Sequence, residues 1–321
     1  MAGHILAFLN LLMLSSAAYV LVDDYSGEAL LSNFSFFTGP DPTQGFVEYL
    51  GESESRAAGL VNVTTGDDGQ AIAYIGVDST NLAPNGRASV RISSNKAYND
   101  GLFVADFKHV PGTTCGTWPA FWMVGPDWPH GGEIDIYEGV NLDYLNGMTL
   151  HTGPNCIVTP QRHAYTGIMV TQNCDVNAPD QEQNKGCQIK SRNRLSFANA
   201  MNDGGGGVFA SEWNDTAITI WYFARAEGIP QDILSGDPQP DGWGIPEAMF
   251  GGNGCYFGKS FANLSIVFDI TFCGQWAGGV WQFSPCSSII SSCKAFVEKF
   301  PSAFRDSYWE VRSVKVYQKK N

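Results

Sequence analysis

Residues 131–139 read Gly-Gly-Glu-Ile-Asp-Ile-Tyr-Glu-Gly, which places three carboxylates within six positions and brackets them with glycines. Because successive side chains of a β-strand project from opposite faces, Glu133 and Asp135 share one face and the two isoleucines share the other. Strict alternation would aim Glu138 among apolar groups, where an unpaired carboxylate is costly. A β-bulge at Ile136-Tyr137 would reset the alternation with one extra residue. We therefore predict a bulged strand that carries all three acids on one face.

This arrangement suits the cleavage of glycosidic bonds, which uses one protonated carboxyl group to assist the leaving oxygen and one carboxylate to attack or stabilise the sugar carbon. Strand geometry separates the backbones of Glu133 and Glu138 by about 13 Å, and side chains that lean together can approach the roughly 5.5 Å carboxyl separation of retaining enzymes. Asp135 would hold a proton or a hydrogen bond on one neighbour, because crowded carboxyl groups spread their pKa values. Two alternatives stay open at this point, a solvated strand face and a Ca²⁺ site.

The composition describes a globular protein that can bury a large core. Of the 321 residues, 44% are hydrophobic, 13% are aromatic and only 16% are charged, which excludes a disordered chain. The net charge of -13 would repel nucleic acid and acidic membrane surfaces, so we expect neither as a partner. All-β units of this size commonly form one domain, and no low-complexity linker divides the chain.

The N-terminal residues have the pattern of an export signal. An apolar run from Ile5 to Leu14 precedes the small residues 15–18 and is too short to span a bilayer. The polar C-terminal residues argue against a lipid-anchor tail. We therefore predict a signal peptide over residues 1–18, a single domain over residues 19–321, and a secreted, extracellular protein that acts as a monomer.

Eight cysteines and four N-glycosylation patterns agree with an exported protein. The cysteines contain no C-x-x-C pair, so disulfides are favoured over a zinc site, although their pairing stays open. Three of them lie in Pro154–Gly207, which we predict to be loops stapled by disulfides. The cysteines are Cys115, Cys156, Cys174, Cys187, Cys255, Cys273, Cys286 and Cys293, and the acceptor patterns begin at Asn33, Asn62, Asn214 and Asn263.

Strand patterns dominate the rest of the chain. Alternating apolar residues predict strands over Ala88–Ser93 and Leu264–Phe272, a hairpin within Glu212–Phe223, and a bulged last strand over Trp309–Tyr317. Only Ser288–Phe300 has convincing helical periodicity. With 36 glycines, 16 prolines and no alternation of strands with helices, the chain is predicted to have an all-β fold, an antiparallel sandwich.

Tryptophans gather just upstream of the acids. Trp118, Trp122 and Trp128 lie within eleven residues of each other, and indole rings offer an apolar face for sugar CH groups together with one N–H donor. This pattern predicts a saccharide-binding face, with core packing as the alternative. We assign Trp118, which precedes Pro119, to the core, and we expect Trp276, in a glycine-flanked turn, to be exposed.

The chain resembles glycoside hydrolase family 16 in four segments: the Glu-Ile-Asp-Ile-Tyr-Glu strand, the Gly-Thr-Trp-Pro-Ala-Phe-Trp approach over residues 116–122, the Met-Thr-Leu-His-Thr-Gly stretch over 148–153, and the last strand over 308–318. Within that family it is most similar to fungal secreted laminarinase-type endo-β-1,3(4)-glucanases. The likeness extends over about residues 20 to 318.

The resemblance implies a β-jelly-roll sandwich with a concave substrate cleft and a retaining double displacement on a β-glucan polysaccharide. No cofactor and no metal is expected for this chemistry. By position, Glu133 would be the nucleophile, Asp135 its assisting carboxylate and Glu138 the general acid/base.

The resemblance also implies a set of substrate-binding residues. Trp122, Trp128 and Trp276 would line the sugar subsites, while Arg91 and His151 would donate hydrogen bonds to sugar hydroxyls. A surface ion pair for the arginine and a structural role for the histidine are the alternatives. The segment between Trp122 and Trp128 is shorter and more apolar than expected, which leaves the preferred glucan linkage open.

Two other functions remain compatible with the sequence. A non-catalytic β-glucan-binding, lectin-like protein could share the same sandwich, although the intact pair of glutamates argues against it. A glucan transglycosylase would use the same acids but pass the sugar to an acceptor instead of water. No Gly-x-Ser-x-Gly elbow, His-Glu-x-x-His motif or Walker lysine occurs in the chain.

Overall fold

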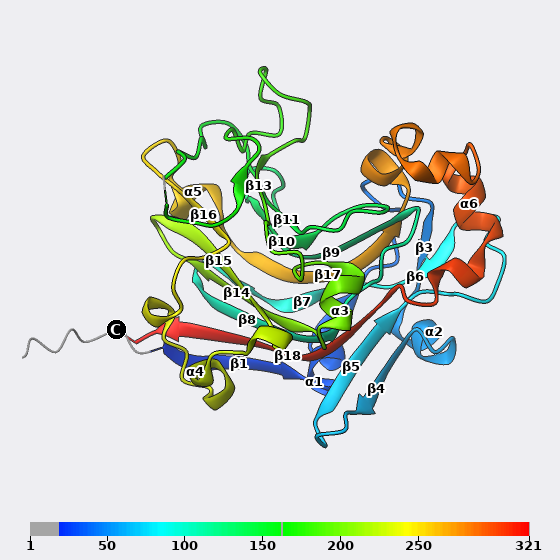
Figure 1. The fold of residues 1–321 in the computed structure, drawn as a ribbon, viewed down its shortest axis with the longest axis horizontal. Helices are drawn as coiled ribbons and strands as arrows, with labels where there is room; N and C mark the ends of the chain where they lie inside the picture. The colour runs from blue at the N-terminus through cyan, green and yellow to red at the C-terminus, as the bar shows by residue number, and fades with distance from the viewer. Residues whose placement is uncertain (1–18, 162, 321) are drawn as a thin grey trace, which may run out of the picture.

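In a computed structural model, strands form two antiparallel sheets that pack face to face (Figure 1). The structure describes residues 19–161 and 163–320, so the predicted signal peptide lies outside the described residues. The first sheet contains, in spatial order, β16 (Ala248–Gly251), β15 (Ala217–Ala224), β14 (Gly207–Trp213), β8 (Gly101–His109), β18 (Tyr308–Lys319), β5 (Ala71–Gly76) and β4 (Val61–Thr65), with β1 (Tyr19–Ser26) paired to β18. The second contains β12 (Ile168–Met169), β13 (Cys187–Lys190), β11 (Gly147–His151), β10 (Glu133–Glu138), β9 (Thr117–Val124), β17 (Leu264–Phe272), β7 (Arg91–Tyr98) and β2 (Phe34–Phe36). A small parallel pair joins β3 (Val47–Tyr49) to β6 (Arg87–Ser89). The predicted antiparallel β-sandwich is confirmed.

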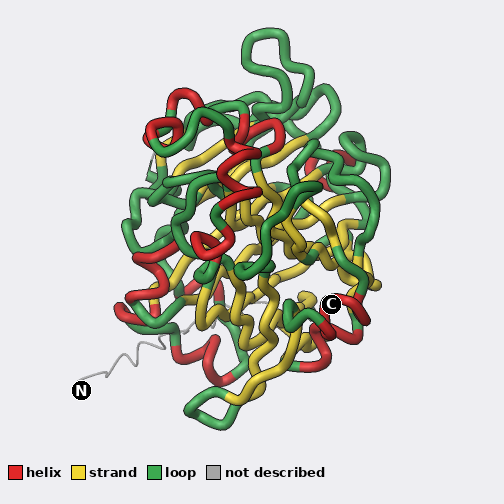
Figure 2. Tube along the Cα trace, turned by 90° about the vertical axis from the view of Figure 1, so that its right-hand side faces the viewer, coloured by secondary structure: helices red, strands yellow, loops and turns green. Residues whose placement is uncertain are grey.

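The helices are short and lie outside the two strand layers (Figure 2). They are α1 (Glu28–Ser32), α2 (Glu52–Ala57), α3 (Ala198–Asp203), α4 (Gln231–Ser235), α5 (Phe257–Ser260) and α6 (Cys293–Lys299). Short 3₁₀ turns occur at Arg225–Glu227, Pro240–Gly242, Trp281–Phe283, Pro285–Ser288 and Pro301–Phe304, and a π-helical turn at Gly274–Gly278. Within the described part of the chain, no helix has the length and apolarity needed to cross a membrane.

Aromatic side chains fill the space between the two sheets. Phe107, Phe209 and Trp309 project from the first sheet, Phe121 and Phe268 project from the second, and all five are buried. Neighbouring ring centroids among them lie 4.8 to 6.4 Å apart. Each such aromatic pair adds about 0.5–1.5 kcal/mol beyond the burial of its surface. This packing gives the second sheet a rigid inner support.

Most of the predicted strands occur with small changes. β17 has the predicted bounds, and the hairpin of β14 and β15 places Ile218 and Ile220 in the core. The predicted strand over 88–93 is divided between β6 and β7. The predicted bulge in the last strand is present, since the register of β18 against β8 shifts between Glu310 and Ser313.

The predicted helix over Ser288–Phe300 is too long. α6 begins only after Ser292, whose hydroxyl accepts a hydrogen bond from the Ala295 N–H at 3.3 Å and caps the helix. Upstream, the carbonyl of Ile290 accepts a hydrogen bond from the Trp281 indole at 3.0 Å. Side chains therefore supply hydrogen bonds that a longer helix would have made with its own backbone.

All eight cysteines form disulfides, which join Cys115 to Cys286, Cys156 to Cys255, Cys174 to Cys187, and Cys273 to Cys293. The predicted loop segment Pro154–Gly207 contains three of these cysteines, so its stapling by disulfides is confirmed. It also contains the short elements β12, β13 and α3, which were not expected from the sequence.

The acceptor asparagines differ in exposure. Asn33, Asn62 and Asn263 are exposed, whereas Asn214 is half-buried. The side-chain oxygen of Asn214 accepts a hydrogen bond from the Thr216 N–H at 2.9 Å. Three of the four patterns therefore present their asparagine to solvent.

The acid strand β10 contains the predicted bulge. Against β9, the register passes from Asp135 opposite Trp122 to Tyr137 opposite Phe121, so one extra residue of β10 is accommodated. Ile136 and Tyr137 are both buried in the core. The bulge therefore directs the two successive side chains of Ile136 and Tyr137 to the inner face, so that Glu138 lies on the outer face.

A buried asparagine completes the backbone hydrogen bonding at this bulge. Asn146 immediately precedes β11, where the register shifts between Asp135 and Glu138. Its side-chain oxygen accepts a hydrogen bond from the Glu138 N–H at 2.9 Å, and its side-chain nitrogen donates to the Ile136 carbonyl at 2.8 Å. Asn146 is fully buried, so one side chain replaces the two strand contacts that the bulge interrupts.

Replacing Asn146 with Leu, a side chain of similar size, should destabilise the fold. Two buried backbone groups would lose their partners, at about 1–3 kcal/mol each. The free energy of unfolding, measured by urea denaturation, should fall by about 2–6 kcal/mol. Asn85→Leu is the matched control, because Asn85 is exposed. Equal stability of the two variants would contradict this role for Asn146.

Candidate active site

The outer face of the second sheet brings side chains from five strands into rows. Residues that lie opposite one another on neighbouring strands form three rows across this face. The first row contains His151 and Glu133, the second contains Asp135 and Trp122, and the third contains Glu138, Ala120, Asp269 and Arg91. In Figure 1, the loops between β11 and β13 and the helical segment that leads into α6 flank this face. The strand register therefore places residues that are far apart in the sequence side by side.

The three acids differ in their contacts. The His151 Nε2 atom lies 3.3 Å from Asp135 Oδ2 and 4.0 Å from Glu133 Oε1. Glu138 Oε1 accepts a hydrogen bond from the Trp118 indole at 2.7 Å. The Glu133 side chain is 18% exposed, whereas Asp135 is 2% exposed and Glu138 is 8% exposed. Glu133 is therefore the most accessible member of the cluster.

Burial raises the pKa of each acid. Desolvation, followed by repulsion from Asp135, raises the pKa of Glu133 to about 8. Desolvation also raises the pKa of Asp135 to about 8 and holds the pKa of Glu138 well above that of an ordinary carboxyl group. The cluster consequently holds at least one proton at neutral pH.

Neighbouring groups adjust the raised pKa values of the two glutamates. His151, Trp128 and Arg91 all favour the ionised form of Glu133. Glu138 is more buried, and desolvation together with repulsion from Asp135 raises its pKa, while the Trp118 hydrogen bond and His151 act in the opposite direction. The pKa of both glutamates is raised, but the less buried Glu133 is the one that ionises more readily, and Glu138 is better placed to keep its proton.

Trp118 belongs to this face, so its assignment to the core was wrong. Besides its hydrogen bond to Glu138, its ring packs edge to face against Trp276 with centroids 5.5 Å apart. Both indoles are half-buried. The π-helical turn at Gly274–Gly278 positions the second of them. The expected exposure of Trp276 is thus only partial, and the pair extends the face beside Glu138.

Trp122 and Arg91 form a second aromatic contact region. The Arg91 guanidinium lies 5.0 Å from the ring centroids of both Trp122 and Phe37. The Trp122 indole donates a hydrogen bond to Asp269 at 2.8 Å, and the Tyr49 hydroxyl donates to the same carboxylate at 3.1 Å. Arg91 is therefore packed between rings beside the acids and belongs to none of the surface ion pairs in the described residues.

Trp128 is the most exposed of the predicted aromatic residues, at 44%. It lies in the loop that follows β9, within reach of the Glu133 carboxyl group, whose ionised form it favours. The face therefore brings together all eight predicted site residues: Glu133, Asp135, Glu138, Trp122, Trp128, Trp276, His151 and Arg91.

Three of these residues could also hold a metal ion. Donor atoms of Glu133, Asp135 and His151 lie within 4.8 Å of one another. Two carboxylates with one imidazole suit a transition metal better than Ca²⁺, which takes six to eight oxygen ligands. The same contacts also fit a second role without a metal, in which His151 pairs with Glu133 and Asp135 and favours the charged form of Glu133.

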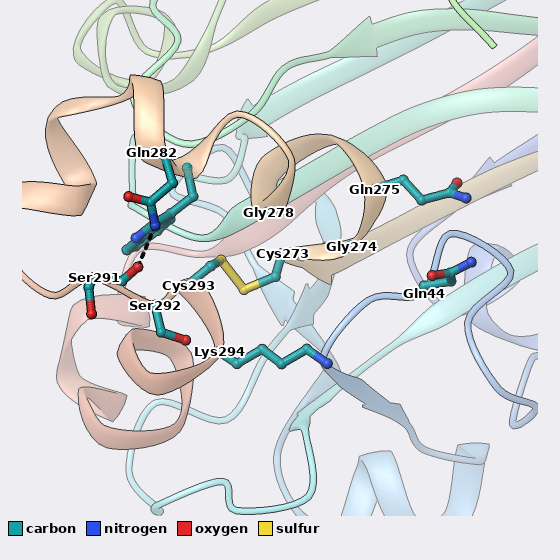
Figure 3. A pocket seen from close by; sticks show the side chains of 11 residues that line it. Gln44, Cys273, Gly274, Gln275, Gly278, Gln282, Ser291, Ser292, Cys293 and Lys294 are labelled. Atoms are coloured by element: carbon teal, nitrogen blue, oxygen red, sulfur yellow. Dashed lines mark hydrogen bonds between the residues drawn. A yellow bond between two sulfur atoms is a disulfide. The ribbon is translucent and has the colours of Figure 1, made fainter. Parts of the chain in front are cut away.

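Two surface hollows have linings that contain none of the three acids. One, of about 440 Å³, lies beside the Cys273–Cys293 disulfide and is lined by Gln275, Gln282 and Lys294 among others (Figure 3). The other, of about 490 Å³, has Tyr49 in its lining. The acids therefore lie on the sheet face rather than within either hollow.

Four residues of this region were missed from the sequence or misplaced. Asp269 had a signal, because it is a lone acid on the polar side of an apolar strand. Asn146 and Tyr49 had none, since their roles depend on a bulge and on a contact between distant segments. Trp118 was misplaced because a neighbouring proline does not decide which face a strand residue occupies.

Comparison with known proteins gives the family. Residues 34–317 match the XgeA-like, catalytic GH16 domain. An endo-1,3(4)-beta-glucanase of Arthroderma benhamiae is 45% identical over 95% of this chain and 66% of its own length. Laminarinase 16A from Phanerochaete chrysosporium, solved with 6-O-glucosyl-laminaritriose in both donor and acceptor sites, is 40% identical, with a TM-score of 0.86 over 94% of this chain and 100% of that one. An elongating GH family 16 beta-1,3-glucosyltransferase is 41% identical, with the same TM-score and the same coverage.

These similarities cover nearly all of this chain but not all of each relative. The chain spans 66% of the length of the Arthroderma protein and 45–46% of three Aspergillus relatives, which is less than two thirds in each case. The structural matches confirm the β-jelly-roll sandwich. The family match, the sheet order and the sequence identity lead to one assignment: the chain belongs to glycoside hydrolase family 16, among its XgeA-like members.

Proposed function

We propose that this chain is a retaining endo-β-glucanase that hydrolyses β-1,3-glucans or mixed β-1,3/1,4-glucans. The observation that carries the proposal is the bulged strand β10, which places Glu133, Asp135 and Glu138 on one tryptophan-lined sheet face. Relatives from Arthroderma and Emericella that bear the name endo-1,3(4)-beta-glucanase support this substrate class. No metal and no organic cofactor is part of the proposed reaction.

The proposed reaction has two displacements. Glu133 attacks the anomeric carbon while Glu138 gives its proton to the departing glycosidic oxygen, so the sugar becomes covalently bound to Glu133. Glu138, now a carboxylate, takes a proton from water, which attacks the same carbon and releases Glu133. Two inversions give net retention of the anomeric configuration. Asp135, with its raised pKa, shares a proton or a hydrogen bond with Glu133 and eases the departure of that carboxylate.

The remaining residues of the face would bind the glucan chain. Trp122, Trp128 and Trp276 would stack on sugar rings, because indoles combine a large apolar surface with one polar group. Arg91 and His151 would donate hydrogen bonds to sugar hydroxyls. Each of these residues lies beside the acids, which supports the roles that the family resemblance implies.

We also propose that the protein is secreted and acts on glucan outside the cell as a monomer. The four disulfides support an oxidising compartment. Three exposed glycosylation patterns agree with passage through a secretory route.

Glucosyl transfer is the second candidate function. The observation in its favour is the similarity to an elongating β-1,3-glucosyltransferase at 41% identity. Both reactions share the covalent intermediate and differ in the group that attacks it. Chromatographic sizing of products from laminariheptaose separates them, because hydrolysis gives only shorter chains and transfer also gives longer ones.

Replacing Glu133 with Gln should lower kcat on laminarin by roughly 10⁴-fold or more, because the nucleophile is lost. Binding of laminarihexaose should persist, since the tryptophans remain. Glu310→Gln is the matched control, because Glu310 lies on the first sheet and pairs with Lys108. A reducing-sugar assay measures turnover, and near-native turnover by the Glu133 variant would refute the assignment. A wild-type protein that binds laminarin without releasing reducing ends would instead be a lectin.

Replacing Trp118 with Phe should move the basic limb of the pH–rate profile to higher pH. The indole hydrogen bond lowers the pKa of Glu138, so its removal raises that pKa, and the acid stays protonated to a higher pH. Trp128→Phe is the matched control, because Trp128 lowers the pKa of Glu133. Its loss should move the acidic limb of the profile to higher pH and leave the basic limb in place. Profiles of kcat/KM from pH 3 to 9 would test both shifts. A basic limb that stays in place would argue against Glu138 as the acid.

The newly formed reducing end should appear first with the β configuration of the bond that was cut. Retention follows from two successive displacements at one carbon. Proton NMR recorded in the first minutes of hydrolysis, before mutarotation, measures the initial anomer. An initial α product would mean that one of the two glutamates activates water directly while the other protonates the leaving oxygen, and the double displacement would be abandoned.

A further inference from the structure

Asp269 is a buried carboxylate next to the acid cluster with no role in the reaction described above. It lies on the outer side of β17, is 6% exposed and has no lysine or arginine within 4.0 Å among the described residues. Its two oxygens accept one hydrogen bond each, from the Trp122 indole at 2.8 Å and from the Tyr49 hydroxyl at 3.1 Å. Both oxygens are thus committed to aromatic side chains.

Keeping a charge at this position costs stability. Burial raises the pKa of Asp269 to about 6, and repulsion from Asp41 adds to the effect. The Arg91 charge, opposite Asp269 in the strand register, and the two hydrogen bonds act against it but do not cancel it. A buried carboxylate without a close ion-pair partner is usually less stable than a neutral side chain of similar volume. The residue is therefore better explained by what it orients than by stability.

The hydrogen bond fixes the orientation of an indole that is already packed on one side. The Arg91 guanidinium lies over one face of the Trp122 ring, 5.0 Å from its centroid. A sugar can then stack only on the opposite face. The hydrogen bond from the indole nitrogen to Asp269 fixes the side-chain torsion angles of Trp122. It therefore determines whether the free face of the ring is available to a sugar bound beside the three acids.

We propose that Asp269 is a positioning residue, which holds the Trp122 indole in the orientation that accepts a sugar ring. The Tyr49 hydroxyl, from the parallel pair β3–β6, donates to the other oxygen of the carboxylate and leaves the oxygen that faces Trp122 free to accept from the indole. The proposal rests on the proposed function for the role of Trp122 in binding. It assigns Asp269 no contact with the reacting atoms.

The test measures laminarihexaose binding by calorimetry in proteins that also carry Glu133→Gln, so that no turnover interferes. Asp269→Ala should weaken binding roughly tenfold, the size expected for a lost hydrogen bond to a charged group. Asp269→Asn should restore most of the affinity, since its oxygen can still accept from the indole, and its Tm should equal or exceed that of the parent. A merely structural role would lower affinity and Tm together in both variants.

A double-mutant cycle decides whether Asp269 acts through Trp122. In a Trp122→Phe background, which keeps a ring but has no indole N–H, Asp269→Ala should cause no further loss of binding. Tyr49→Phe is the matched control, because it removes the other hydrogen bond to the same carboxylate and should have a much smaller effect. An equal loss from Asp269→Ala in both backgrounds, or no loss in either, would overturn the proposal.

A second measurement is independent of any glucan. The indole N–H resonance of Trp122, identified by its absence in Trp122→Phe, should move upfield and exchange faster with solvent in Asp269→Ala. An unchanged resonance would overturn the proposal. If the parent protein bound no laminarihexaose, the proposed function would fail, and this resonance would still decide whether Asp269 holds the indole.

Discussion

The candidate site depends on two hydrogen bonds made by one buried side chain. Asn146 pairs with the Glu138 N–H and the Ile136 carbonyl, and so makes a bulge stable in the centre of a sheet, where interrupted backbone pairing is otherwise costly. The bulge sends Tyr137 into the core, where its ring stacks on Phe197 with centroids 4.7 Å apart. Without the extra residue, Glu138 would replace that ring in an apolar layer. The chemistry of the outer face and the packing of the inner face therefore have the same local cause.

The acid cluster is a source of instability that the rest of the fold must offset. The pKa values of Glu133 and Asp135 are raised to about 8, above the values near 4 of unfolded carboxyl groups. The folded state therefore binds more protons than the unfolded state between about pH 4 and pH 8, and the stability contributed by these groups falls as the pH rises through that window. The aromatic layer between the sheets and the four disulfides supply stabilisation that does not depend on pH in this range. A strongly stabilised scaffold is thus a condition for keeping three carboxyl groups together.

The parts of the structure that follow local rules could be predicted from the sequence. Alternation of side chains gave β17 and the bulge in β10, because one buried face constrains the register of a strand. The helix over 288–300 was overestimated, since the Trp281 indole and the Ser292 hydroxyl compete with helical hydrogen bonds. Partners such as Asn146, Tyr49 and Asp269 could not be paired in advance, because strands distant in sequence must first be placed side by side.

Glu133 and Glu138 have different surroundings, and this difference affects what happens to the proposed covalent intermediate. Glu133 is flanked by His151 and Trp128, which favour its charge, whereas Glu138 is flanked by the Trp118–Trp276 pair. In the proposed reaction the departing part of the glucan leaves from the oxygen that Glu138 protonates, so it leaves beside those two indoles. A ring held there after the first displacement is placed to attack the intermediate in place of water. In the proposed mechanism, longer retention of a sugar by these two half-buried indoles would favour transfer over hydrolysis without any change in the three acids.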